Sequence, residues 1–187
     1  MASNIEIKAV LTDRATAEGT AIRLSNSGPE IIHQEDFFFH CPGARLKLRI
    51  FSPNPSPDPG SPDYGELIHY QRSNDAEARR SDYLIACTQD PKSLLEILSA
   101  TLGILGTVTK RRTLYLIGQT RVHLDEVEGL GSFLELEVML RPGQSDEEGK
   151  NVAWALLREF GVDQTQIIGE AYIDLLARHT SPTVARL

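Results

Sequence analysis

The sequence predicts an α+β fold built on an antiparallel sheet or barrel. Two observations favour it: about eight segments alternate apolar and polar residues with the period of two that is typical of strands, whereas helix signals are few. The chain has 187 residues, of which 41% are hydrophobic, so it can bury a core, and its length fits one domain. We place that domain at residues 1–178, followed by a C-terminal tail at 179–187.

The predicted strands are short alternating runs separated by turn residues. Between residues 52 and 62, prolines recur at alternating positions, which removes backbone donors and indicates a solvated excursion between two strands. In chain order, the predicted strands cover residues 5–10, 36–40, 45–51, 65–72, 82–87, 107–116, 120–127 and 133–140.

Helices are indicated mainly by their ends. Asp90 and Pro91 supply an N-cap and a first-turn proline for a helix that stops at Gly103. Ser145 and Glu148 have the spacing of a capping box, and an apolar stripe follows them. An alanine-rich segment at 13–24 and a short segment at 170–177 are the other two predicted helices.

The chain is acidic, with 19 Lys and Arg against 26 Asp and Glu and a formal charge of −7 at pH 7. This balance argues against nucleic acid or a membrane surface as a partner, but it leaves room for a local basic pocket. Glu6 and Lys8 stand where a signal peptide has an apolar run, so we expect a cytoplasmic protein. Cys41 and Cys87 lie far apart without zinc-site spacing, which argues against a disulfide framework.

The polar faces of several predicted strands carry charges in a regular pattern. Arg45, Lys47 and Arg49 share one face, and Glu135 and Glu137 lie about 7 Å apart on another. Each row is either the solvated face of a sheet or part of a lining around a common axis. Three cations in alternate positions repel one another unless an anion lies among them, and carboxylates bind Mg²⁺ or Mn²⁺. A polyphosphate with a divalent metal would use both rows, which favours the second interpretation.

In their order along the chain, these segments resemble the CYTH superfamily of triphosphate tunnel metalloenzymes, and within it the branch of class IV adenylate cyclases. The resemblance implies a closed eight-stranded antiparallel β-barrel, whose tunnel binds a triphosphate and a divalent metal, with helices packed outside. It is carried by Asn4-Ile5-Glu6-Ile7-Lys8 and by residues 43–49, 65–68, 80–83, 121–131, 133–138 and 172–176.

The resemblance also implies two sets of site residues, although it assigns no catalytic group and no residue for recognising a base. The acidic set would hold Mg²⁺ or Mn²⁺ and comprises Glu6, Asp125, Glu135 and Glu137. The basic set would bind the triphosphate and comprises Lys8, Arg45, Lys47, Arg49, Arg72, Lys110, Arg112 and Arg121. These assignments give the tunnel a charge of +4 and the rest of the chain −11.

One residue departs from the family pattern. Asn4 occupies the first acidic position of the ExExK motif, where an amide offers an oxygen but no charge. This change predicts weaker or different binding of a second metal ion.

The leading hypothesis is an adenylate cyclase-like enzyme that converts ATP to cyclic AMP and pyrophosphate. A hydrolase acting on tripolyphosphate, thiamine triphosphate or a nucleoside triphosphate is the first alternative, because the same tunnel would serve it. A non-catalytic sensor of phosphate or nucleotide is the alternative from a different class. The apolar stripes of the two clearest helices would pack on the barrel or on a second copy of the chain, so a homodimer stays open.

Overall fold

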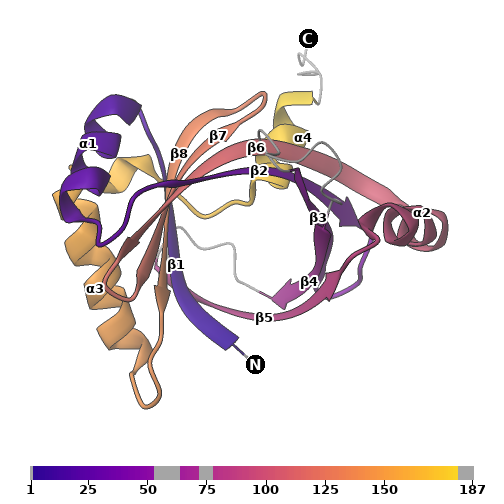
Figure 1. Ribbon diagram of the computed structural model, residues 1–187, viewed down its shortest axis with the longest axis horizontal. Helices are drawn as coiled ribbons and strands as arrows, with labels where there is room; N and C mark the ends of the chain where they lie inside the picture. Colours follow the sequence, from indigo (N-terminus) through magenta and orange to yellow (C-terminus); the bar gives the residue numbers. More distant parts are fainter. Residues whose placement is uncertain (1, 53–63, 72–77, 181–187) are drawn as a thin grey trace, which may run out of the picture.

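A computed structural model describes residues 2–52, 64–71 and 78–180 (Figure 1). Its strands form one antiparallel sheet in the order β5-β4-β3-β2-β6-β7-β8-β1-β9, and a further pairing of β5 with β1 closes eight of them into a barrel. Helices lie outside this barrel. The prediction of an α+β fold with a closed eight-stranded antiparallel barrel is confirmed.

The strands are longer than the alternation predicted in several places. β2 and β6 start earlier than expected, because they pair along nearly their whole lengths, from Glu30 opposite Leu114 to Phe39 opposite Ile104. The proline-rich excursion, apart from Ser52, and Arg72 lie outside the described residues. The strands are β1 (Ala2–Val10), β2 (Glu30–Phe39), β3 (Arg45–Ser52), β4 (Tyr64–Gln71), β5 (Arg79–Thr88), β6 (Ile104–Ile117), β7 (Thr120–Val127), β8 (Gly131–Met139) and β9 (Ile167–Ile168).

The predicted helix ends are confirmed by hydrogen bonds. The Asp90 side chain accepts from the Ser93 backbone N–H, and Ser145 and Glu148 form the reciprocal capping box. Gly103 has a φ of 72°, the left-handed region that favours glycine at a helix end. The helices are α1 (Arg14–Leu24), α2 (Pro91–Leu102), α3 (Asp146–Glu159) and α4 (Tyr172–Thr180).

The alternation along the strands gives the barrel an apolar outer face and places most of the charged strand residues of the site inside it. On β1, Ile5 and Ile7 belong to the buried apolar cluster that packs against α1 and α3. Glu6, between these two residues, and Lys8, directly after them, line the interior cavity. The helices α1, α2 and α3 pack on the apolar outer face of the sheet, whereas Tyr172, the first residue of α4, lines the interior cavity (Figure 1). No helix within the described ranges is long and apolar enough to cross a membrane.

Candidate active site

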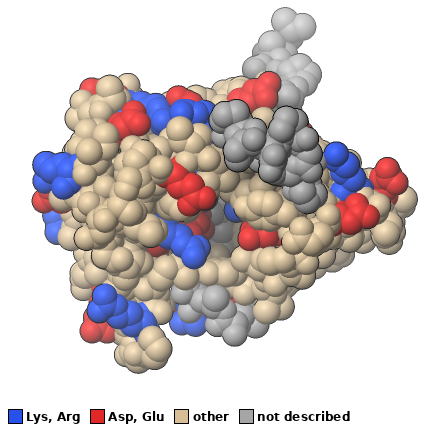
Figure 2. Space-filling model, viewed as in Figure 1, with Lys and Arg blue, Asp and Glu red and all other residues tan. Residues whose placement is uncertain are grey.

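A cavity of about 310 Å³ lies inside the barrel, and it appears as a hollow with acidic and basic side chains at its edge (Figure 2). Among the side chains that the structure describes, its charged lining comes from β1, β2, β3, β4, β6, β7 and β8. The basic lining residues are Lys8, Lys47, Arg49, Lys110, Arg112 and Arg121, and the acidic ones are Glu6, Asp36, Glu66, Glu135 and Glu137.

Three of these cations converge on Asp36, which β2 places opposite Arg49 of β3. The Asp36 carboxylate accepts hydrogen bonds from Lys47 Nζ at 2.8 Å and from Arg49 Nε at 2.7 Å. Lys110 Nζ lies 3.9 Å from Asp36 Oδ2. Burial alone would raise the pKa of Asp36, but the charges of Arg49, Lys47 and Lys110 outweigh it and hold this pKa well below its usual range.

The crowding of cations also changes the lysines themselves. Burial and the charge of Arg49 lower the pKa of Lys47 to about 7, against the opposing effect of Asp36. Burial and Arg112 lower the pKa of Lys110 to about 8. Both lysines therefore change protonation close to neutral pH.

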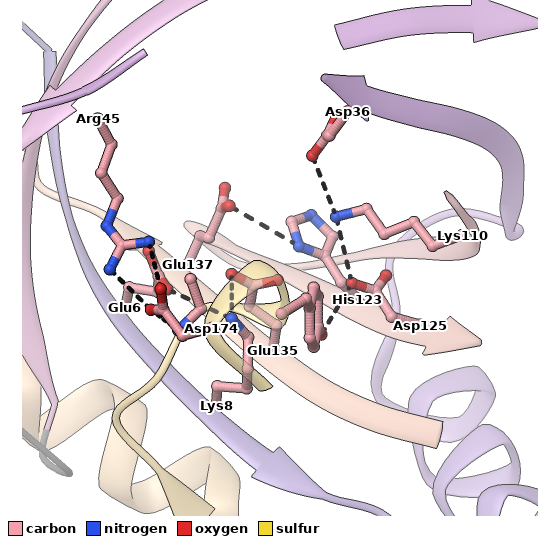
Figure 3. A network of polar contacts seen from close by, with 12 residues as sticks. Glu6, Lys8, Asp36, Arg45, Lys110, His123, Asp125, Glu135, Glu137 and Asp174 are labelled. Atoms are coloured by element: carbon pink, nitrogen blue, oxygen red, sulfur yellow. Dashed lines mark hydrogen bonds and ion pairs between the residues drawn. The ribbon is translucent and has the colours of Figure 1, made fainter. Parts of the chain in front are cut away.

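A second cluster is centred on Arg112. Its guanidinium donates two hydrogen bonds of 2.7 Å to Asp125 and one of 2.8 Å to Glu135. The Tyr172 hydroxyl donates to Asp125 at 3.1 Å, and Lys110 Nζ lies 3.7 Å from the same carboxylate. Lys110 thereby stands between the carboxylates of Asp36 and Asp125 (Figure 3).

Three cavity-lining carboxylates lie side by side on β1 and β8. Glu6 is paired in register with Glu137, and Lys8 with Glu135. Lys8 Nζ is 3.8 Å from the Glu135 carboxylate and 4.0 Å from that of Glu6. Burial and the charge of Glu135 raise the pKa of Glu137.

A divalent metal ion fits this acidic group, because a cation beside Glu137 would relieve the repulsion that raises its pKa. In the described part of the chain, no group of three or more His, Cys, Asp or Glu side chains is placed so that it could hold a metal ion by itself. Mg²⁺ is commonly held by one or two carboxylates together with substrate phosphates and water, so an incomplete protein site suits it.

A scan of the chain against protein families matches the CYTH domain over residues 2–172. The chain belongs to the CYTH domain family. A search of curated proteins found no match for this CYTH chain.

Solved structures share the CYTH barrel at low sequence identity. The PH1012 protein of Pyrococcus horikoshii has a TM-score of 0.78 and 24% identity, covering 92% of this chain and 98% of its own. A candidate adenylate cyclase of Vibrio parahaemolyticus has a TM-score of 0.74 and 16% identity, covering 93% and 97%. HpAC1 of Hippeastrum, described as a candidate adenylyl cyclase with a dominant triphosphatase activity, has a TM-score of 0.61 and 19% identity, covering 98% and 100%. At these identities the likeness establishes the fold.

Two residues of the expected site lie apart from the lining of the CYTH cavity. Arg45 forms a two-hydrogen-bond ion pair with Asp174 of α4, at 2.7 and 3.2 Å. Asp125 is fully buried behind the lining and is occupied by Arg112 and Tyr172. Arg72 lies outside the described residues. The remaining expected residues line the cavity: Glu6, Lys8, Lys47, Arg49, Lys110, Arg112, Arg121, Glu135 and Glu137.

Two lining carboxylates were not predicted. Asp36 shares its face of β2 with Phe38, and Glu66 of β4 is paired in register with Arg49. With six of the 19 basic residues and five of the 26 acidic residues, the described lining carries +1 and the rest of the chain −8. The sequence-based charge of +4 for the tunnel counted Arg45, Arg72 and Asp125 and omitted these two acids. Since Arg72 lies outside the described residues, that total stays a prediction.

Two further polar side chains are buried at the CYTH site. Asn4 lines the cavity at 4% exposure, and its amide oxygen has no hydrogen-bond partner among the described residues. His123 is 3% exposed, with Nδ1 lying 3.8 Å from a Glu137 carboxylate oxygen. Burial and the charge of Arg112 hold the pKa of His123 well below its usual range, so this imidazole is neutral.

Proposed function

We propose that this CYTH protein is a metal-dependent enzyme that acts on a triphosphate in the barrel cavity, converting ATP to cyclic AMP and pyrophosphate. The observation that carries the proposal is the convergence of Lys47, Arg49 and Lys110 on one buried carboxylate. Donors that gather around the oxygens of Asp36 are also arranged to gather around phosphate oxygens, with charge-assisted hydrogen bonds. The candidate adenylate cyclase of Vibrio parahaemolyticus, which has the same fold, supports this choice of reaction.

The roles proposed for the residues follow from their positions. The basic lining residues, together with Arg72 by sequence, bind the phosphate oxygens. Glu6, Glu135 and Glu137 hold Mg²⁺ or Mn²⁺, and the metal supplies positive charge against the phosphate oxygens when it is bound. Asp125 acts through Arg112, whose guanidinium it fixes with two hydrogen bonds.

In the proposed reaction, the 3′-hydroxyl oxygen of ATP bonds to the α-phosphorus, and the bond from that phosphorus to the bridging oxygen breaks. Pyrophosphate leaves, and the hydroxyl proton is released. The cationic side chains neutralise charge that develops on the leaving pyrophosphate. The narrow cavity holds the triphosphate so that the attacking and leaving oxygens stay in line.

Hydrolysis of a triphosphate is the second candidate reaction. The dominant triphosphatase activity described for HpAC1 of Hippeastrum, whose fold this chain shares, favours it. The same basic residues would bind the substrate, while water would replace the ribose hydroxyl as the attacking group.

The test is an assay with ATP, GTP, tripolyphosphate and thiamine triphosphate, each with Mg²⁺ or Mn²⁺. Cyclic nucleotide, pyrophosphate and orthophosphate are measured in the same reactions. Cyclic AMP with pyrophosphate is the result that we expect. Orthophosphate without cyclic AMP would establish the hydrolase, and tight binding without any product would establish a sensor. Failure to bind any of the four compounds would overturn the triphosphate site itself.

A further inference from the structure

His123 lies beside the carboxylates that are proposed to hold the metal ion. β7 places it opposite Glu135 of β8, and its side chain lies against Glu137, which stands two residues further along β8 (Figure 3). His123 is only 3% exposed, and it is not among the residues that line the cavity. The imidazole is therefore next to the acidic group without itself facing a ligand in the cavity.

The Nδ1 atom of His123 is a buried polar atom that has no hydrogen-bond partner among the described residues. It lies 3.8 Å from Glu137 Oε1, which is longer than a hydrogen bond. A buried polar atom without a partner is costly, so an approach of these two atoms to hydrogen-bond distance is favourable.

The chemistry of the contact makes Nδ1 the donor. A neutral imidazole carries its proton on one ring nitrogen, and the other nitrogen is a bare acceptor. A carboxylate only accepts hydrogen bonds, so a bare Nδ1 facing Glu137 would bring two acceptors together. The contact therefore favours the tautomer with the proton on Nδ1.

Glu137 is held less firmly than Glu135. Glu135 Oε2 accepts a hydrogen bond of 2.8 Å from Arg112. Arg121 and His123 each approach one oxygen of Glu137, both at 3.8 Å. The Arg121 side chain is 50% exposed, whereas that of His123 is 4% exposed. Of these two neighbours of Glu137, His123 is the one whose position is fixed by packing.

We propose that His123 is a positioning residue, whose Nδ1–H donates a hydrogen bond to Glu137 and holds this carboxylate in the orientation that binds the divalent metal ion. Hydrogen-bond partners of metal ligands set ligand orientation in this way. The inference rests on the proposed function and adds to it a residue that touches neither the metal nor the substrate.

The experiment compares two variants of nearly equal shape, His123→Asn and His123→Leu. Asparagine and leucine branch at the same atom, but only the amide of asparagine offers an N–H near the position of Nδ1. Mn²⁺ affinity is measured by EPR spectroscopy at saturating tripolyphosphate, so the readout does not depend on turnover. In His123→Leu, we expect Mn²⁺ to bind about 10–100-fold more weakly than in the wild type. His123→Asn should restore most of the lost affinity.

A control separates the hydrogen bond from simple packing. Calorimetry of tripolyphosphate binding with a chelator present should give the same affinity in the wild type and in both variants, which also shows that the cavity is folded. Equal losses of Mn²⁺ affinity in His123→Asn and His123→Leu would mean that the imidazole only fills space, and they would overturn the positioning role.

Two spectra examine the imidazole directly. Nitrogen NMR of protein with labelled histidine, bound to Mg²⁺ and tripolyphosphate, should show the proton of His123 on Nδ1, and the His123→Asn spectrum identifies its signal. A proton on Nε2 alone would overturn the inference. Pulsed EPR should show no coupling between Mn²⁺ and a histidine nitrogen. Such a coupling, absent from His123→Leu, would make His123 a metal ligand and would also overturn the positioning role.

The outcomes separate this inference from the proposed function. If the wild type binds tripolyphosphate and Mn²⁺, and His123→Leu binds Mn²⁺ equally tightly, the positioning role is wrong and the proposed function stands. If the wild type does not bind tripolyphosphate, or binds it without Mn²⁺, the proposed function fails, and the inference fails with it.

Discussion

Asp36 has three cationic neighbours and is only 2% exposed. Its carboxylate holds Lys47 and Arg49 at one point of the cavity, where mutual repulsion would otherwise separate them. A phosphate group that enters this point meets donors that are already gathered. Asp36 also repels the same phosphate. Binding therefore requires that the cations around Asp36 outnumber this one carboxylate.

Replacing Arg49 with alanine should weaken the binding of tripolyphosphate by about 1.5–3 kcal/mol, the usual contribution of a hydrogen bond to a charged group. Isothermal titration calorimetry with Mg²⁺ present measures the change. Arg45→Ala is the matched control from the same face of β3, and it should have a smaller effect, because Arg45 is held by Asp174 outside the cavity lining. An effect of Arg45→Ala as large as that of Arg49→Ala would contradict these positions.

The carboxylates of Glu135 and Glu137 on β8 lead to a prediction about metal binding. Glu135→Gln and Glu137→Gln should each abolish metal-dependent turnover and leave the fold intact, because glutamine keeps the shape but loses the charge that binds the ion. Turnover and circular dichroism are measured together. Glu128→Gln, at an exposed position in the turn before β8, should keep full activity. Full activity in both β8 variants would show that these carboxylates hold no metal.

The two buried lysines predict a pH dependence of binding. Lys47, with a pKa of about 7, and Lys110, with a pKa of about 8, lose their charges as the pH rises through this range. The affinity for tripolyphosphate should therefore fall from about pH 6.5 to about pH 9, with proton uptake on binding at the higher pH. Lys47→Arg should move the onset of this fall to higher pH, because arginine stays charged. A dissociation constant that stays flat over this range would refute the prediction.

The same lysines affect folding stability with a definite sign. In the unfolded chain they keep their protons to about pH 10.4, whereas in the folded protein they lose them near pH 7 to 8. The unfolded state therefore binds more protons across this window, so the contribution of these lysines to the free energy of unfolding rises with pH.

Side-chain direction was predictable from the sequence where it depends on strand period alone. Lys47 and Arg49 alternate with Leu46 and Leu48, so their common face followed from the pattern. Arg45 shares that pattern, but its partner Asp174 belongs to α4, whose position against β3 is a tertiary contact. Asp36 was not predicted for the same reason, because its contacts with Lys47 and Arg49 depend on the pairing of β2 with β3.

At the scale of the element, signals confined to a few neighbouring residues were the most informative. The caps at Asp90 and Ser145 were predicted because N-cap hydrogen bonds span only three residues. The early starts of β2 and β6 were missed because each strand is extended by its pairing with the other. β9 was missed because it has two residues and exists through its pairing with β1.

The packing of α3 on the barrel gives a prediction of stability. A Cβ atom on Gly149 would lie 2.7 Å from Ile5 Cγ1 and 2.6 Å from Leu140 Cδ2. Gly149→Val should therefore lower the free energy of unfolding by about 1–3 kcal/mol, as overpacking does. Urea unfolding measures it. Gly19→Ala in α1 is the control, since nothing lies within 4 Å, and it should raise stability by about 0.5–1 kcal/mol. Equal stability of Gly149→Val and the wild type would contradict the contact of α3 with β1.

The whole molecule has a formal charge of −7, whereas the described lining of its cavity carries +1. A triphosphate carries several negative charges, which this small excess among the described side chains does not balance, so we expect a divalent metal to contribute to the balance. Removal of metal with a chelator should accordingly weaken the binding of tripolyphosphate, measured by calorimetry, and added Mg²⁺ should restore it. Binding that is equally tight without metal would contradict this charge balance.

The most direct test of the central claim is a crystal structure with a non-hydrolysable ATP analogue and Mn²⁺. We predict phosphate groups in contact with Lys47, Arg49 and Lys110, with the metal between the phosphates and the carboxylates of Glu135 and Glu137. An analogue bound only outside the barrel, or an empty cavity at saturating analogue, would contradict the claim that this cavity is the triphosphate site.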